Sequence, residues 1–195
     1  MKVKLKDLTD IQTGYPFRGA IVAGSSTEGL AVIQMGDLAE NLVPDLKNVI
    51  RSGSVSVKAG HVLKSGDILF RARGNFPAGY WLKELPERMI AAAPLQRIRI
   101  RTNALLPGFL AWYLRQSAAQ SYFEANSQGS SLRMVGIDVL ENLMIPVIPL
   151  EKQQKIIELV ELSERERELA QKLIALKSVY INKTVNGLEN DNGNR

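Results

Sequence analysis

The sequence predicts an α+β fold: a globular part of short strands and helices over residues 1–148, followed by one long coiled-coil-like helix over 149–186. Three observations lead to this prediction. Short apolar runs broken by glycine and proline fill the N-terminal half, helical spacing begins at Pro107, and a heptad-like apolar repeat covers the last segment. We expect the polar residues 187–195 to form a disordered tail.

Composition excludes several classes of protein. The chain has 195 residues, 45% hydrophobic and 23% charged, which is near the average for globular proteins. It has no cysteine, which excludes a disulfide scaffold, an iron–sulfur cluster and a cysteine nucleophile, and its one histidine, His61, excludes a two-histidine metal motif. No apolar run approaches the roughly 18 residues of a membrane span. The N-terminus is basic, but no apolar segment follows it, so it is not a signal peptide. We therefore expect a cytoplasmic protein without a membrane partner.

The net charge of +5 lies entirely in the globular part. Residues 151–195 carry 8 basic and 8 acidic side chains, whereas residues 1–150 carry 17 basic and 12 acidic ones. A basic globular part can bind a polyanion such as nucleic acid. The alternative is an ordinary basic protein that binds no nucleic acid.

The first hundred or so residues read as a short helix followed by strands and turns. Leu5 and Leu8 mark the helix, a strand and turn follow over 11–19, and a strand over 30–35 ends at Gly36-Asp37. Residues 40–60 offer short strands at best.

Two later strands carry arginines. Residues 67–73 read as a mostly buried strand whose arginines emerge at its end. Further short segments follow over 79–82 and 89–93. Residues 95–101 read as a strand, and strict alternation over its last five residues places three arginines on one face and two isoleucines on the other.

Helical character begins at Pro107, because proline is well tolerated in the first turn of a helix. A second helix is expected over 117–124 and a short third helix over 137–143, followed by a short strand at Met144-Ile145. Residues 128–133 read as a loop.

The long C-terminal helix is predicted from its ends and its period. Pro149 is a start signal and Asn186-Gly187 a stop signal. Apolar residues recur along this segment in alternating steps of three and four, as in a coiled coil. The run 164–168, rich in glutamate and arginine, is interpreted as a solvated face of the helix. The chain offers no second long helix, so the apolar stripe calls for a helix of another chain. We expect the dimer contacts to be Leu162, Leu169, Leu173 and Leu176.

Enzyme motifs are missing. The sequence has neither a P-loop nor a GxGxxG motif, and residues 75–78 lack the first proline of the Asn-Pro-Pro-Tyr loop of adenine methyltransferases. We expect no catalytic residue, no cofactor and no metal site, and we interpret His61 as a surface turn residue.

Loop arginines, amides and hydroxyls are the candidate DNA contacts. Arginine binds phosphate or guanine, and asparagine pairs with adenine. The alternative interpretation of the arginines is surface salt bridges, and Tyr15 and Phe17 are interpreted as packing residues rather than base-stacking ones. The candidates are Arg18, Arg71, Arg73, Asn75, Gln128, Ser130 and Arg133.

Several motifs occur together in a characteristic order. They are Gly14-Tyr-Pro-Phe-Arg-Gly19, Val32-Ile-Gln-Met-Gly-Asp37, Gly66-Asp-Ile-Leu-Phe-Arg-Ala-Arg-Gly74, Ala92-Ala-Pro-Leu95, Leu110-Ala-Trp-Tyr-Leu114, Gln128-Gly-Ser-Ser-Leu-Arg133 and Ile145-Pro-Val-Ile-Pro-Leu150 before the long helix. In this order the sequence resembles the specificity (S) subunit of type I restriction–modification systems. The resemblance covers residues 4–185.

The resemblance implies a non-catalytic subunit that reads double-stranded DNA, docks adenine methyltransferase (M) subunits and is joined by restriction (R) subunits. The usual S subunit has two target-recognition domains and two conserved helical regions, whereas this chain has one of each. A homodimer through the long helix would restore the usual arrangement and would read a bipartite site with inverted repeats. Pairing with a different half subunit stays open. The alternative function is a coiled-coil assembly scaffold whose globular domain binds protein rather than DNA.

Overall fold

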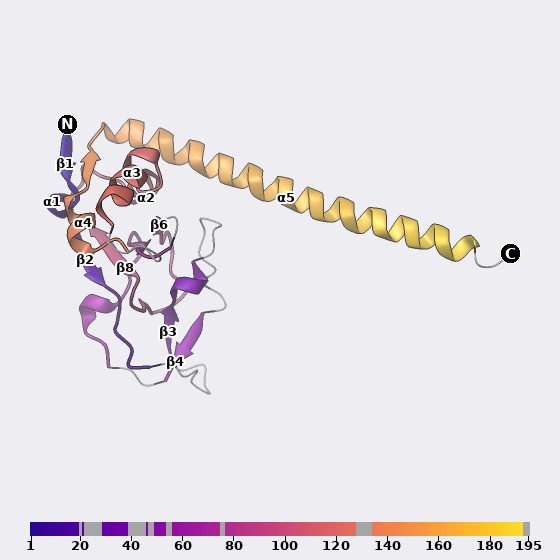
Figure 1. Ribbon diagram of the computed structural model, residues 1–195, viewed down its shortest axis with the longest axis horizontal. Helices are drawn as coiled ribbons and strands as arrows, with labels where there is room; N and C mark the ends of the chain where they lie inside the picture. The colour runs from indigo at the N-terminus through magenta and orange to yellow at the C-terminus, as the bar shows by residue number, and fades with distance from the viewer. Residues whose placement is uncertain are drawn as a thin grey trace. The chain divides into compact units, whose positions relative to one another are not determined.

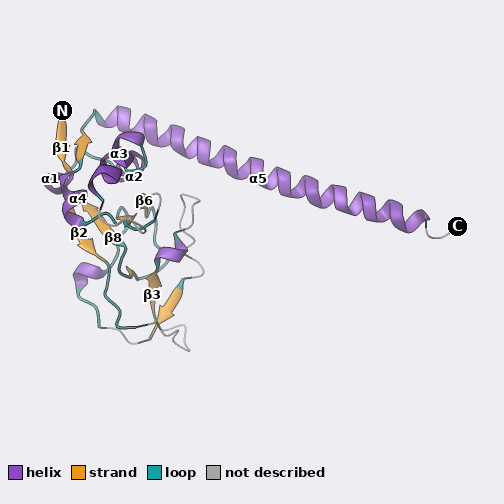
Figure 2. Cartoon of the chain, viewed as in Figure 1, coloured by secondary structure: helices purple, strands orange, loops and turns teal. Residues whose placement is uncertain are grey.

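The computed structural model describes residues 1–192 except 20, 22–28, 39–45, 47–48, 54–55, 75–76 and 128–133, with side chains to residue 184. The chain divides into two compact units, Met1–Gln154 and Lys155–Arg195. Short strands and helices build the first unit, and one long helix forms the second (Figures 1 and 2). This arrangement confirms the predicted α+β class.

A four-stranded antiparallel sheet forms the centre of the first unit, in the order β2-β8-β5-β6. Its strands are β2 (Thr9–Thr13), β8 (Gln96–Ile100), β5 (Ile68–Arg71) and β6 (Ala78–Trp81). The first three residues of β5 are buried and Arg71 is half-buried, as expected for a core strand with arginine at its end. The strand predicted over 95–101 is confirmed as β8.

A three-stranded sheet packs beside it in the order β4-β3-β7, where β3 and β7 run parallel. Its strands are β4 (Ile50–Ser52), β3 (Leu30–Ile33) and β7 (Met89–Ala91). The 3₁₀ turn η1 (Met35–Asp37) follows β3, and the turn η2 (Ala59–His61) precedes β5. Ile33, Leu69 and Met89, all fully buried, belong to one apolar core shared by the two sheets.

The described residues of the first unit also form four short helices: α1 (Leu5–Leu8), α2 (Pro107–Tyr113), α3 (Ser117–Asn126) and α4 (Ile137–Asn142). A two-stranded sheet pairs β1 (Lys2–Lys4) with β9 (Met144–Pro146). Pro107 stands in the first turn of α2, as predicted. A Cβ on Gly79 of β6 would lie 2.8 Å from Leu114 Cδ1, so the absence of a side chain there allows the segment containing α2 to approach the sheet closely.

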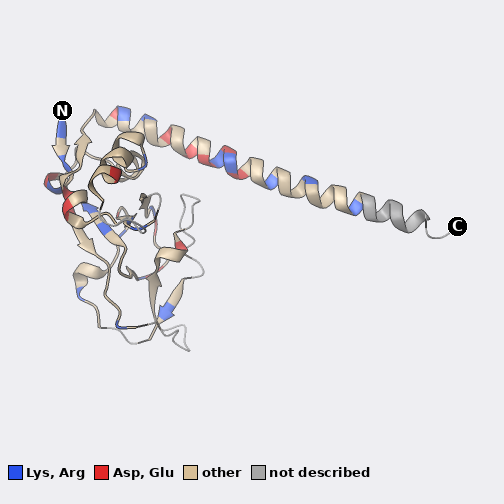
Figure 3. Cartoon of the chain, viewed as in Figure 1, with Lys and Arg blue, Asp and Glu red and all other residues tan. Residues whose placement is uncertain are grey.

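The long helix α5 spans Leu150–Asn192 and starts directly after Pro149, as predicted. It continues past Asn186-Gly187, so the expected end at 186 and the expected tail from 187 differ from the structure, and residues 193–195 lie outside the described part. One glycine inside a helix costs only about 1 kcal/mol relative to alanine, which does not end a long helix by itself. Charges of both signs follow one another along α5 (Figure 3).

The expected apolar stripe is solvent-exposed on α5. Four leucines that we predicted as dimer contacts are more than half exposed: Leu162 67%, Leu169 52%, Leu173 53% and Leu176 67%. These side chains are therefore available for contact with a partner helix.

Candidate nucleic-acid interface

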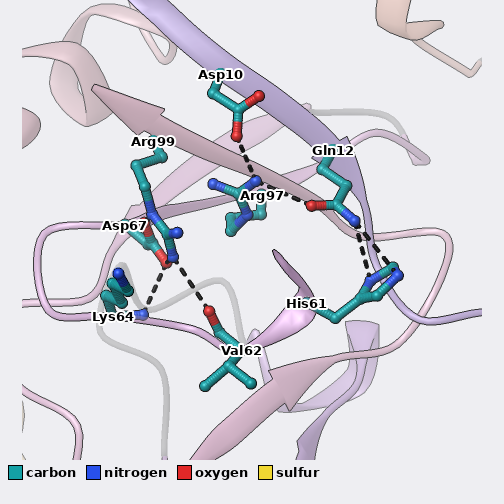
Figure 4. Close-up of polar contacts among 8 residues, drawn as sticks. All are labelled: Asp10, Gln12, His61, Val62, Lys64, Asp67, Arg97 and Arg99. Carbon is teal, nitrogen blue, oxygen red and sulfur yellow. Dashed lines mark hydrogen bonds and ion pairs between the residues drawn. The ribbon is translucent and has the colours of Figure 1, made fainter. Parts of the chain in front are cut away.

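The three arginines of strand β8 and its end contact the protein itself. Arg97 Nη2 donates to Asp10 Oδ2 at 2.6 Å and to Gln12 Oε1 at 3.0 Å, and its side chain is only 5% exposed. Arg99 donates to both carboxylate oxygens of Asp67, at 2.7 and 2.6 Å, and to the Val62 carbonyl. Figure 4 shows these contacts. Arg101 Nη2 donates to the Lys6 carbonyl. Arg97 and Arg99 therefore bind the sheet together rather than present their charge to a ligand.

These ion pairs shift the pKa values of their members. The hydrogen bond from Arg97 lowers the pKa of Asp10 below its ordinary value of 3.8, despite partial desolvation. The hydrogen bond to Asp67 raises the pKa of Arg99 above its ordinary value. Both shifts favour the charged forms.

We expect Asp10→Asn to lower stability at pH 7 and to change its acid dependence. A carboxylate whose pKa is lower in the folded state stabilises fully above its unfolded pKa, and this contribution is lost as pH falls through the folded pKa. The stability difference between the wild type and Asp10→Asn should therefore shrink below about pH 4. Urea unfolding at pH 7, 4 and 3 measures it, and a difference that stays constant over this range would refute the role of Asp10.

Arg73 lies just after strand β5, beside residues 134 and 135. Arg73 pairs with Met134 in an isolated antiparallel bridge, and the Val135 amide donates to the Ala72 carbonyl at 2.9 Å. Gln96, which is 3% exposed, donates to the Val135 carbonyl. The end of β5 and the residues directly after 128–133 therefore lie side by side.

Arg71 and Arg73 differ in how far their side chains are exposed to solvent. Arg73 is exposed, and its Nε contacts Met134 Sδ at 3.3 Å. Arg71 is half-buried, with Nη1 3.4 Å from the Leu38 carbonyl. Gly74 takes φ +111°, a conformation that favours glycine and turns the chain directly after Arg73. Arg73 is therefore the more available cation for a ligand.

The predicted contacts Asn75, Gln128, Ser130 and Arg133 lie outside the described residues. Their neighbours are placed, however. Gln120 of α3 donates to the carbonyl of Pro77, directly after residues 75–76, at 2.9 Å. Arg73 and Pro77, on either side of residues 75–76, thus each contact another part of the domain.

Arg18 lies in a different loop, beside a surface hollow of about 430 Å³. The hollow is lined by residues of three loops, among them Phe17, Gln34 and Pro94, and these loops carry three of the motifs noted in the sequence. Arg18 is exposed, and Gly19 after it has φ +89°. Gly14 holds the first loop against strand β7, because a Cβ there would lie 2.6 Å from the Ala91 carbonyl oxygen.

The Tyr15 ring packs against both Phe17 and His61. The Tyr15 ring meets Phe17 edge-on at 5.0 Å and His61 at 5.5 Å. Tyr15 and Phe17 also pack on the buried residues Val32 and Ile90. This favours the packing interpretation of both aromatic residues. His61 is half-buried on the turn η2, beside Gln12 Nε2 at 3.3 Å.

Three glutamines whose roles the sequence does not reveal hold loops in place: Gln96 and Gln153, which are buried, and Gln120, which is half-buried. Each donates to a backbone carbonyl far away in the chain. Their only signal in the sequence is a polar residue next to apolar neighbours, which does not reveal a partner.

Among the described residues, no group of three or more His, Cys, Asp or Glu side chains is placed to hold a metal ion. No helix in that part of the chain is long and apolar enough to cross a membrane.

The fold and the exposed arginines define a class of protein: a basic recognition module joined to one long helix. The chain belongs to the family described as the type I restriction modification DNA specificity domain, which matches residues 1–177. The family description thus assigns a DNA specificity domain to most of the chain. A comparison with curated proteins finds no match.

Solved structures share the fold at low sequence identity. A chain from a study of complex assembly and conformational transition of the type I R-M system has a TM-score of 0.61 and 21% identity, covering 85% of this chain and 38% of that one. The HsdS subunit of Thermoanaerobacter tengcongensis has a TM-score of 0.58 and 22% identity, covering 88% and 38%. The type I S subunit of M. genitalium has a TM-score of 0.54 and 17% identity, covering 88% and 41%. This chain therefore spans about two fifths of the length of these proteins.

Proposed function

We propose that this chain is a half-length specificity subunit that directs adenine methyltransferase and restriction subunits to a bipartite DNA site. The observation that carries the proposal is the family match over 1–177 in a chain with one recognition unit and one long helix. Relatives of known structure are more than twice as long, since the matched part covers 38–41% of them. Two copies of this chain supply two recognition units.

The second part of the proposal is a homodimer through α5. The leucine stripe, formed by Leu162, Leu169, Leu173 and Leu176, is more than half exposed in one chain. A second copy offers the same stripe, and a two-fold axis lets the two stripes cover each other. The resulting dimer reads two half-sites in opposite orientation.

The third part of the proposal concerns DNA contact. Arg73 and Arg18 are exposed in separate loops, whereas Arg97 and Arg99 are engaged in ion pairs within the domain. Exposed arginines next to loops can neutralise phosphates and read base edges. Arg71 and the predicted contacts Asn75, Gln128, Ser130 and Arg133 complete the proposed set, because they belong to the same chain segments as Arg73 and its partner Met134.

Co-expression tests the proposed function. The chain should co-purify with an adenine methyltransferase subunit of its own organism, and the pair should methylate plasmid DNA at one split motif that neither protein methylates alone. Partner binding that is independent of salt, without any gain in DNA methylation, would favour the protein-binding scaffold instead.

Arg73→Ala is expected to weaken DNA binding by the methyltransferase assembly. If Arg73 holds a phosphate, affinity falls for every sequence, and the slope of log K against log salt decreases by about 1. If Arg73 reads a base, the loss is about 1–3 kcal/mol and confined to one position of the site. Fluorescence anisotropy over a salt series distinguishes these outcomes. Arg167→Ala on α5 is the matched control, and equal affinities of the two variants would remove Arg73 from the interface.

A further inference from the structure

Gln153 is a fully buried polar residue at the start of a helix whose other polar side chains are mostly exposed. Its exposed fraction is 0%. Its side-chain Oε1 accepts from the Leu106 amide at 2.8 Å, and Nε2 donates to the carbonyls of Ala104 and Ile148, each at 2.8 Å. Both donors of the amide and one acceptor position are therefore used.

These bonds join three segments of the globular unit. Ala104 and Leu106 belong to the loop between β8 and α2, and Leu106 is the residue that caps α2. Ile148 lies in the connection from β9 to α5. The backbone N–H of Gln153 donates to the Pro149 carbonyl in the first turn of α5. The first turn of α5 is thereby part of the globular unit, which extends to Gln154.

The clamp depends on the amide group. A glutamate at this position would direct carboxylate oxygens at two carbonyl oxygens, and an apolar side chain would leave the backbone groups of residues 104, 106 and 148 without these partners. A lysine could not accept from the Leu106 amide. Glutamine matches one donor and two acceptors of the backbone at once.

We propose that Gln153 is a positioning residue that sets the gap between the two halves of the target site. This inference rests on the proposed function, in which α5 joins two recognition units. The assembly can distinguish one spacing between the two DNA half-sites from another only if each recognition unit is held firmly to its helix α5, which joins the two units. The buried amide supplies that hold at the first turn, without contacting DNA.

The first test uses DNA substrates whose half-sites are separated by the native gap or by one or two base pairs more or less. Gln153→Met keeps the volume and removes the three bonds, and Gln153→Asn keeps the amide on a shorter side chain. We expect the preference for the native gap to fall about tenfold or more, because a misplacement of about 1 Å can cost a hundredfold in a positioned reaction. Base preference within each half-site should stay unchanged. Gln154→Met, at the exposed neighbouring amide, is the matched control.

Folded variants that keep the wild-type gap preference would overturn the proposal. Circular dichroism and thermal melting verify folding before the assay. If the wild-type chain directs no methylation at any split motif, the proposed function fails instead, and the gap assay then gives no information about Gln153.

A second measurement is independent of DNA and requires no change at Gln153. The chain has no native cysteine, so Lys64→Cys and Arg167→Cys accept a pair of spin labels, one on each unit. Labelled chains are diluted with unlabelled ones so that each assembly carries one pair. Double electron–electron resonance should give a narrow distribution of the distance between the two spin labels, and a broader distribution after Gln153→Met. A broad distribution before that change, or an equal width after it, would refute the clamp.

Discussion

The variant Leu169→Glu is expected to be a monomer under conditions in which the wild-type chain is a dimer. Leu169 is 52% exposed on α5 and lies in the middle of the leucine stripe. In a two-fold dimer each copy loses one buried leucine and places a carboxylate in the helix–helix contact. Burial of one leucine contributes about 1.5–3 kcal/mol, and the change occurs on both chains. Together the two losses amount to about 3 kcal/mol or more, so the dissociation constant should rise at least about a hundredfold.

Light scattering and sedimentation of the full chain measure this effect. Gln171→Glu introduces the same charge on the opposite face of α5, since two residues correspond to about 200° around a helix. This control should remain dimeric. A Leu169→Glu chain that is still dimeric would show that the leucine stripe does not form the contact.

The variant Asp67→Ala is expected to have the largest effect on the stability of the globular unit. Asp67 is 1% exposed and accepts two hydrogen bonds from Arg99. It also accepts from the Lys64 amide at 2.8 Å, in the turn before β5. Removal of the carboxylate leaves the charge of Arg99, a partly buried side chain, without its partner. The expected loss is about 3 kcal/mol, at the lower end for a broken buried pair because Arg99 is partly exposed.

Urea unfolding measures this loss, in the Leu169→Glu background so that dissociation of a dimer does not contribute. Asp7→Ala, at an exposed carboxylate on α1, is the control and should change stability by less than about 0.5 kcal/mol. If Asp67→Ala unfolds at the same urea concentration as the control, the ion pair does not stabilise the sheet.

Elements defined by local patterns were predictable from the sequence. The start of α5 follows from Pro149 and its long apolar period, and α2 follows from Pro107. The strand β8 follows from alternation over 95–101. The end of α5 was not predictable, because the weak stop signal Asn186-Gly187 is outweighed by the helix around it.

Contacts between distant residues could not be derived from the sequence. Asp10 and Arg97 are 87 positions apart, and only the pairing of β2 with β8 brings them together. The alternating arginines of β8 thus resemble a basic surface in the sequence, but Arg97 and Arg99 pair with carboxylates of the domain. The same holds for Gln153, whose partners at residues 104 and 106 belong to another loop.

The candidate site was predictable in part for a related reason. The sequence indicates where arginine stands at the end of a strand, as for Arg71 and Arg73. It does not indicate that Met134, which follows the predicted segment 128–133 in the chain, pairs with Arg73. That pairing is a tertiary contact between residues 61 positions apart.

The most direct test of the central claim is a map of methylated adenines in the source genome, made by long-read sequencing with and without this gene. We predict that deletion abolishes methylation at one split motif whose two halves are inverted repeats. This result would establish both the specificity role and the two-fold dimer. Loss of an asymmetric split motif would contradict the homodimer and indicate a different half subunit as partner. Unchanged methylation, in cells that express the chain and the methyltransferase, would contradict the specificity role itself.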